Sequence, residues 1–163
     1  MSSIRQKTIA GLKRGDSFTV SRTFTERDAT AFADIGRDDN PVHFDLRFAK
    51  AKNFHGPICQ GLLVASLLTE IGGQIGWLAS GMNFRFKKPV YFGDTIECQF
   101  TITELDDSNR AKAEVLFKNQ RDETVIEACV TGIAPGLPER RVMELIMTEG
   151  DPTNKSRSGE RPS

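Results

Sequence analysis

The sequence predicts a single α+β domain in which an antiparallel β-sheet wraps around one long central α-helix. Two observations lead to this prediction. Residues 58–77 form the most apolar stretch and have helical spacing, and the segments after them alternate between apolar and polar side chains. An antiparallel sheet around a central helix buries both kinds of apolar face. A chain of 163 residues suits one domain with its own core.

The N-terminal half is expected to contain one strand and two short helices. Residues 16–24 alternate apolar and polar side chains, which is typical of a half-buried strand. Thr25 and Asp28 form a variant of the capping box, which predicts a helix over residues 25–35. Gly36 is expected to end this helix.

The C-terminal half is expected to supply most of the sheet. Period-2 alternation predicts strands at residues 82–87, 95–104, 111–117 and 125–133, with turns at 106–109 and 119–123. Residues 138–147 are expected to form a short surface helix. Residues 148–163 carry no apolar side chain except proline, so we expect a domain over 1–147 and a disordered tail over 148–163.

The overall charge argues against polyanionic partners. The chain has 22 basic and 22 acidic side chains, so no net field attracts nucleic acid or an anionic membrane. The longest apolar run, residues 61–71, is too short to span a bilayer, and the N-terminus lacks the apolar core of a secretion signal. A cytoplasmic protein with no nucleic-acid or membrane partner is predicted.

The cysteines predict neither disulfides nor a metal site. Cys59, Cys98 and Cys129 are widely spaced, odd in number and surrounded by apolar residues, as expected of core thiols in a reducing compartment. Metal binding needs clustered ligands, and no Cys-x-x-Cys or His-x-x-x-His spacing occurs. We therefore expect no metal ion.

Residues 38–45 carry the densest set of proton-handling groups in the chain. The stretch reads Asp-Asp-Asn-Pro-Val-His-Phe-Asp and includes one of only two histidines. Asp45 can cap a short helix over residues 46–53, so the stretch lies between two predicted helices, which favours precise positioning. Asp-Asp-Asn-Pro is also an ordinary turn sequence, so a catalytic site and a surface turn both fit these residues alone.

Gly61 falls in the first turn of the long predicted helix, where glycine weakens a helix. Two explanations fit this position equally. The missing side chain can permit close packing against a neighbouring strand, or it can open the backbone N–H to another molecule.

These features together resemble one family. The segment 32–36 leads into Asp38-x-Asn40-Pro41-x-His43-x-Asp45, and a buried helix opening at Gly61 follows. This combination is similar to the MaoC-like (R)-specific enoyl-CoA hydratases, which have the hot-dog fold. The resemblance covers roughly residues 10–135 and extends to the Lys-Pro-Val-Tyr-Phe-Gly-Asp segment at 88–94.

The resemblance implies reversible syn addition of water to a trans-2-enoyl thioester, giving an (R)-3-hydroxyacyl product. It implies that Asp38 and His43 are the acid–base pair and that Gly61 supplies an oxyanion-binding N–H. Asn40 is expected to shape the loop and to help orient the catalytic water. The substrate is a CoA or acyl-carrier-protein thioester, no cofactor is expected, and the protein is expected to be a homodimer or a dimer of dimers.

The sequence departs from the family pattern at Gln60, because many members have histidine immediately before the oxyanion glycine. The small size of Gly72 and Gly73 suggests room for a longer or branched acyl chain. Two other functions remain open: a hot-dog acyl-CoA thioesterase, which also uses a carboxylate to activate water, and a non-catalytic acyl-CoA-binding subunit. The latter has no need of the pair formed by Asp38 and His43.

Overall fold

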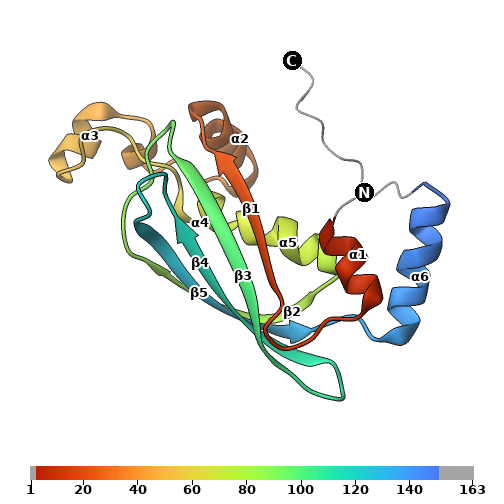
Figure 1. Ribbon diagram of the computed structural model, residues 1–163. Coiled ribbons are helices and arrows are strands. Elements are labelled where there is room, and N and C mark those ends of the chain that lie inside the picture. Colours follow the sequence, from red (N-terminus) through yellow and green to blue (C-terminus); the bar gives the residue numbers. More distant parts are fainter. Residues whose placement is uncertain (1–2, 151–163) are drawn as a thin grey trace.

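The computed structural model describes residues 3–150, and a single antiparallel sheet dominates them (Figure 1). The sheet has five strands in the order β1-β3-β4-β5-β2. Their bounds are Ser17–Thr23 (β1), Leu78–Phe86 (β2), Thr95–Leu105 (β3), Arg110–Lys118 (β4) and Thr124–Ile133 (β5). Each predicted strand is present, and β2 begins four residues before its predicted start at Met82. The predicted α+β class is confirmed.

The core lies between one face of the sheet and a pair of helices, α4 (Gly61–Ala65) and α5 (Leu67–Ile75), which Figure 1 shows lying along that face. The alternation predicted in β3 and β4 places every second side chain in the core, including Ile96, Cys98, Phe100, Ile102, Ala113, Val115 and Phe117, all 0 % exposed. The helices supply Leu67, Ile71 and Ile75. This is the sheet-around-helix arrangement of the hot-dog fold.

The prediction of one continuous helix over residues 58–77 was wrong. Residues 58–60 are extended, and the helix is interrupted at Ser66. The Ser66 hydroxyl donates to the Leu63 carbonyl at 2.6 Å, and side-chain bonds of this kind compete with the helical ladder. The expectation that the helix is buried on nearly all faces was also wrong, because Leu62 is 59 % exposed.

Two short helices flank the stretch at residues 38–45. Helix α2 (Glu26–Gly36) begins at the predicted capping box, in which the Thr25 N–H donates to Asp28 and the Asp28 N–H donates to the Thr25 hydroxyl. The helix ends one residue later than predicted, because Arg37, and not Gly36, takes the left-handed conformation at φ 55°.

Helix α3 (Leu46–Ala51) is capped by Asp45, as predicted. The carboxylate of Asp45 accepts from the backbone N–H groups of Arg47 and Phe48 and pairs with the Arg47 guanidinium. These bonds hold the pKa of Asp45 well below its usual range. Asp45 is therefore occupied as a helix cap.

Two further helices lie side by side at one end of the molecule (Figure 1). Helix α6 (Leu137–Thr148) confirms the predicted surface helix, since none of its residues is buried. Helix α1 (Ser3–Ala10) was not predicted, because its apolar pattern is weak. The predicted tail from residue 148 begins at the last residue of α6, and its residues 151–163 lie outside the described part of the chain. No helix within residues 3–150 is long and apolar enough to cross a membrane.

Arg5 fastens α1 to the core. Its side chain is only 5 % exposed, and its guanidinium donates to the carbonyls of Gly73 at 3.2 Å and Gln74 at 3.1 Å. These carbonyls belong to the last turn of α5, where a cation is favourable; the Gly73 carbonyl also accepts from the Gly76 N–H at 3.3 Å. A long-range bond therefore orders a segment whose own sequence gives little helical signal.

We expect Arg5→Ala to lower the free energy of unfolding by about 2 kcal/mol, because it removes the partly buried, charged hydrogen bonds from Arg5 to two carbonyls. Urea denaturation followed by circular dichroism measures this change. Arg14→Ala is the matched control, since Arg14 is exposed. Equal unfolding midpoints for the two variants would contradict the role given to Arg5.

Candidate active site

The loop between α2 and α3 is shaped by local hydrogen bonds before any residue from elsewhere contributes. The Asn40 side chain accepts from the Val42 N–H at 3.2 Å, and Pro41 opens a 3₁₀ turn that ends at His43. A proline at this point pre-sets the backbone angle for the turn. The motif spacing therefore folds His43 back toward Asp38.

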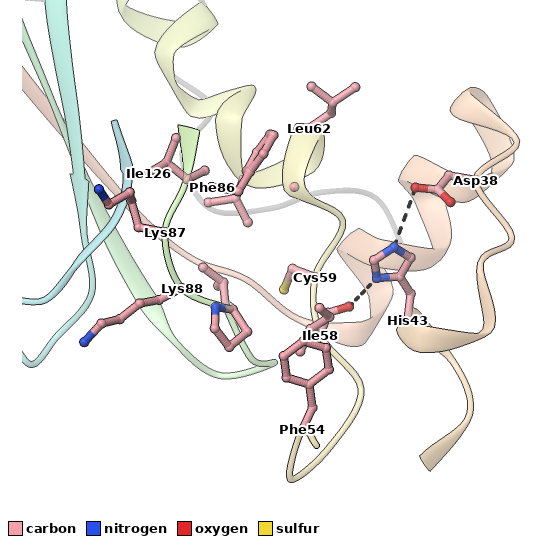
Figure 2. A pocket seen from close by; sticks show the side chains of 14 residues that line it. Asp38, His43, Phe54, Ile58, Cys59, Leu62, Phe86, Lys87, Lys88 and Ile126 are labelled. Carbon is pink, nitrogen blue, oxygen red and sulfur yellow. Dashed lines mark hydrogen bonds and ion pairs between the residues drawn. The ribbon is translucent and has the colours of Figure 1, made fainter. Parts of the chain in front are cut away.

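His43 is almost completely buried, at 6 % exposed, and its ring orientation is determined by one hydrogen bond. Its Nδ1 lies 2.7 Å from the carbonyl oxygen of Ile58 (Figure 2). A carbonyl oxygen can only accept, so Nδ1 carries a proton in this bond. In the neutral ring, Nε2 is then the unprotonated nitrogen, and it faces Asp38.

The carboxylate of Asp38 faces the Nε2 atom of His43. Its Oδ2 is 3.6 Å from His43 Nε2, and its Oδ1 accepts from the Asn40 N–H at 3.3 Å. The Asp38 side chain is 42 % exposed, so solvent reaches it. With a neutral imidazole, two acceptors face each other, and one water molecule can donate a hydrogen to each.

A cavity of about 550 Å³ opens from this pair. Asp38 and His43 line it, and so do Lys87 and Lys88. The remaining lining residues are apolar or small: Phe54, Ile58, Cys59, Gly61, Leu62, Val64, Phe86, Pro89, Val90 and Ile126 (Figure 2). A mostly apolar cavity with a few polar groups suits a small molecule that has an apolar chain and one reacting polar group.

Gly61 lines the same cavity as the first residue of α4. Its N–H therefore belongs to the first helical turn, where no intrahelical acceptor exists. A Cβ at this position would lie 2.7 Å from Cε1 of the Phe86 ring on β2. Both explanations weighed for this glycine thus have a structural basis, because it packs closely on a strand and also exposes its backbone to the cavity.

The structure brings together three of the four predicted site residues. Asp38, His43 and Gly61 line the cavity, whereas Asn40 is exposed and does not. Asn40 has the loop-shaping contact predicted for it, and its part in orienting water stays a prediction. Gly72 and Gly73 do not line this cavity, so the idea that they enlarge an acyl pocket lacks support from its shape.

The cavity walls were not predicted from the sequence. Phe86 was expected on a strand, but alternation alone does not show that it would meet Gly61. Cys59 was assigned to the core and is both buried and part of the cavity wall. Burial, assisted by the negative charges of Asp94 and Asp28, raises the pKa of the Cys59 thiol to about 12. This thiol is therefore neutral near pH 7 and poorly suited to nucleophilic attack.

No group of three or more His, Cys, Asp or Glu side chains in the described part of the chain is arranged to hold a metal ion.

The Cys98 thiol, which is buried in the sheet, resembles that of Cys59. Burial and the charge of Glu70 raise its pKa to about 12.

The chain is similar in sequence to proteins of one family. Residues 10–124 match the MaoC like domain family. The chain is 31 % identical over 142 residues to a mitochondrial 3-hydroxyacyl-[acyl-carrier-protein] dehydratase of Arabidopsis thaliana. The matched region covers 83 % of this chain and 84 % of that protein. The chain is 35 % identical over 98 residues to an (R)-specific enoyl-CoA hydratase of Aeromonas caviae, with 58 % and 73 % covered.

A solved structure shows the same fold. The (R)-hydratase from A. caviae involved in PHA biosynthesis superposes with a TM-score of 0.72 at 29 % identity, covering 77 % of this chain and 98 % of that one. The fold is that of a hot-dog protein from a group of hydratases and dehydratases, which are hydro-lyases. The chain belongs to the MaoC-like domain family.

We expect the thiols of Cys59 and Cys98 to resist alkylation in the folded protein, because burial keeps both protonated. Iodoacetamide labelling at a pH of about 8, followed by peptide mass mapping, compares native protein with protein unfolded in urea. Labelling of Cys59 at least about tenfold slower in the native state is the expected result. Equal rates in the two states would show that the cavity wall opens readily.

Proposed function

We propose that the protein catalyses reversible syn hydration of trans-2-enoyl thioesters, as an (R)-specific enoyl-CoA hydratase or 3-hydroxyacyl thioester dehydratase. One observation carries the proposal. The bond from His43 Nδ1 to the Ile58 carbonyl leaves Nε2 facing the Asp38 carboxylate across 3.6 Å, and both side chains line a mostly apolar cavity. The names of the relatives from A. caviae and A. thaliana support this reaction class.

The two acceptors fit the chemistry of hydration. Water must lose a proton as its oxygen bonds to the β-carbon, and the α-carbon must gain one. A water between Asp38 Oδ2 and His43 Nε2 can give a proton to one of these groups, and a proton can return to the α-carbon from the same side of the substrate. Addition from one side is syn addition.

Gly61 is proposed to stabilise the charge that develops on the thioester oxygen. As water adds, this oxygen gains negative charge, and an N–H in a first helical turn is already oriented to receive it. Glycine at this point accommodates the Phe86 ring, since a Cβ would lie 2.7 Å from its Cε1, while the Gly61 backbone still lines the cavity. Water, thioester and protein groups balance the reaction, so we propose that it needs no cofactor or metal.

The carrier of the acyl group is proposed to be CoA or acyl carrier protein, and both occur in the names of the relatives. Lys87 and Lys88 line the cavity and are suitably charged for a phosphate-bearing carrier. Each also pairs within the chain, Lys87 with Glu127 at 3.7 Å and Lys88 with Glu123 at 2.7 Å. We propose that the protein binds neither nucleic acid nor a membrane.

We further propose that the protein is a homodimer, alone or within a dimer of dimers, formed along the free edge of β2. Both β1 and β2 are edge strands, but their exposed side chains differ. β1 exposes serine and threonine, whereas β2 exposes Leu78, Met82 and Phe86 at 68 %, 45 % and 54 %. An apolar edge beside the exposed Leu62 of the cavity wall suits pairing with a second copy.

The predicted cytoplasmic location stays a prediction. The relatives from A. thaliana and Solanum lycopersicum are named as mitochondrial proteins, so the family does not decide the compartment.

We expect Asp38→Asn and His43→Ala each to lower the turnover number for crotonyl-CoA hydration by about 10² or more, as for a general acid or base. The loss of enoyl absorbance measures the reaction. Asp39→Asn is the matched control, because Asp39 is an exposed carboxylate next to the site and does not line the cavity. Unchanged hydration in both site variants would rule out the proposed pair.

The same assay separates the competing functions. Release of free thiol without prior loss of the enoyl absorbance would indicate a thioesterase. Binding of acyl-CoA with neither reaction would indicate a non-catalytic subunit. Chiral analysis of the 3-hydroxyacyl product tests the (R) configuration.

Light scattering after gel filtration should give twice the mass of the chain, or four times for a dimer of dimers. Met82→Glu is expected to shift the protein toward the monomer, because it places a charge on the proposed apolar edge. Thr19→Glu makes a comparable change on the polar edge strand β1 and should leave the mass unchanged. A monomeric wild-type protein is the outcome that excludes this interface.

A further inference from the structure

One buried polar side chain beside the site has no part in the chemistry proposed above. Gln60, immediately before Gly61, is 1 % exposed. Its Nε2 donates to the Ala29 carbonyl in α2 at 3.0 Å, and its Oε1 has no hydrogen-bond partner among the described residues. Burying an unpaired amide oxygen costs free energy, so an apolar side chain of similar size would suit a purely structural position better.

The bond from Gln60 to Ala29 connects the start of α4, which carries Gly61, to helix α2, which leads to Asp38. Gln60 is the N-cap residue of α4. Its side chain therefore anchors the turn that presents the Gly61 N–H. Ala29 is a fully buried residue of α2, and Asp38 follows the end of that helix. The single bond over 31 positions of sequence therefore joins the element that carries the N–H donor to the element that leads into the carboxylate.

We propose that Gln60 is a positioning residue, which holds the Gly61 N–H in register with Asp38 and His43 through its bond to the Ala29 carbonyl. This inference rests on the proposed function. The Gln60 side chain does not line the cavity, so it acts through the backbone of its neighbour and does not contact substrate. Displacement of an oxyanion donor by a fraction of an ångström weakens transition-state stabilisation more than substrate binding.

Gln60→Met tests the inference, because methionine has nearly the same length and cannot donate. We expect the turnover number for crotonyl-CoA hydration to fall about tenfold or more, while KM changes less than about threefold. Gln74→Met is the matched control. Gln74 also has a buried Oε1 without a partner among the described residues, but it lies at the far end of α5 and does not line the cavity. Its turnover number should stay within about twofold of the wild-type value.

Two further variants separate positioning from packing. Gln60→His keeps a donor of similar reach and should restore most of the turnover that Gln60→Met loses. Gln60→Asn keeps the amide but shortens it by one methylene, so it should lose turnover as Gln60→Met does. It also supplies the comparison if the methionine variant does not fold, with circular dichroism and thermal unfolding reporting the fold of each variant.

The outcomes distinguish this inference from the function on which it rests. A wild-type protein that does not hydrate enoyl-CoA overturns both. An active wild-type protein whose Gln60→Met and Gln60→Asn variants keep full turnover overturns the positioning role alone. Equal losses in Gln60→Met and Gln74→Met would assign the effect to general destabilisation and also overturn it.

Discussion

The site depends on the hydrogen bond between His43 Nδ1 and the Ile58 carbonyl. This bond places the unprotonated nitrogen of the neutral ring toward Asp38, and it joins the motif loop to the extended segment that precedes α4. A second bond, from the Ile58 N–H to the Val42 carbonyl at 3.3 Å, supports the same contact. Without these bonds, the ring could present either nitrogen, and the loop could move relative to Gly61.

The extended segment at residues 58–60 is held from several sides. The Cys59 N–H donates to the Val90 carbonyl at 2.8 Å, and the Gln60 side chain donates to α2. Successive residues of this segment therefore contact the motif loop, the segment after β2 and helix α2. Gly61 follows at once, so the proposed oxyanion donor sits on a backbone fixed by three neighbours. Such support is what a preorganised site requires.

Local rules predicted much of the fold. The capping box at Thr25, the cap at Asp45 and the alternation in β3 and β4 involve residues close in sequence, and each appeared as predicted. One failure arose where distant groups decide, and another where a local side-chain bond competes with the helix. Helix α1 was missed because the buried contacts of Arg5 with α5 hold it in place, and its own apolar pattern is weak. The interruption at Ser66 depends on which partner its hydroxyl selects.

The sequence by itself determined that Asp38 and His43 would meet, because Asn40 and Pro41 fold the short stretch between them through local bonds. It also placed Gly61 at the start of a helix. Only the tertiary structure decided which nitrogen of His43 faces the carboxylate, that Phe86 packs over Gly61, and that Gln60 points to α2 and not into the cavity. These outcomes depend on contacts between residues at least 15 positions apart, whose directions follow from the packing of sheet and helices and not from spacing along the chain.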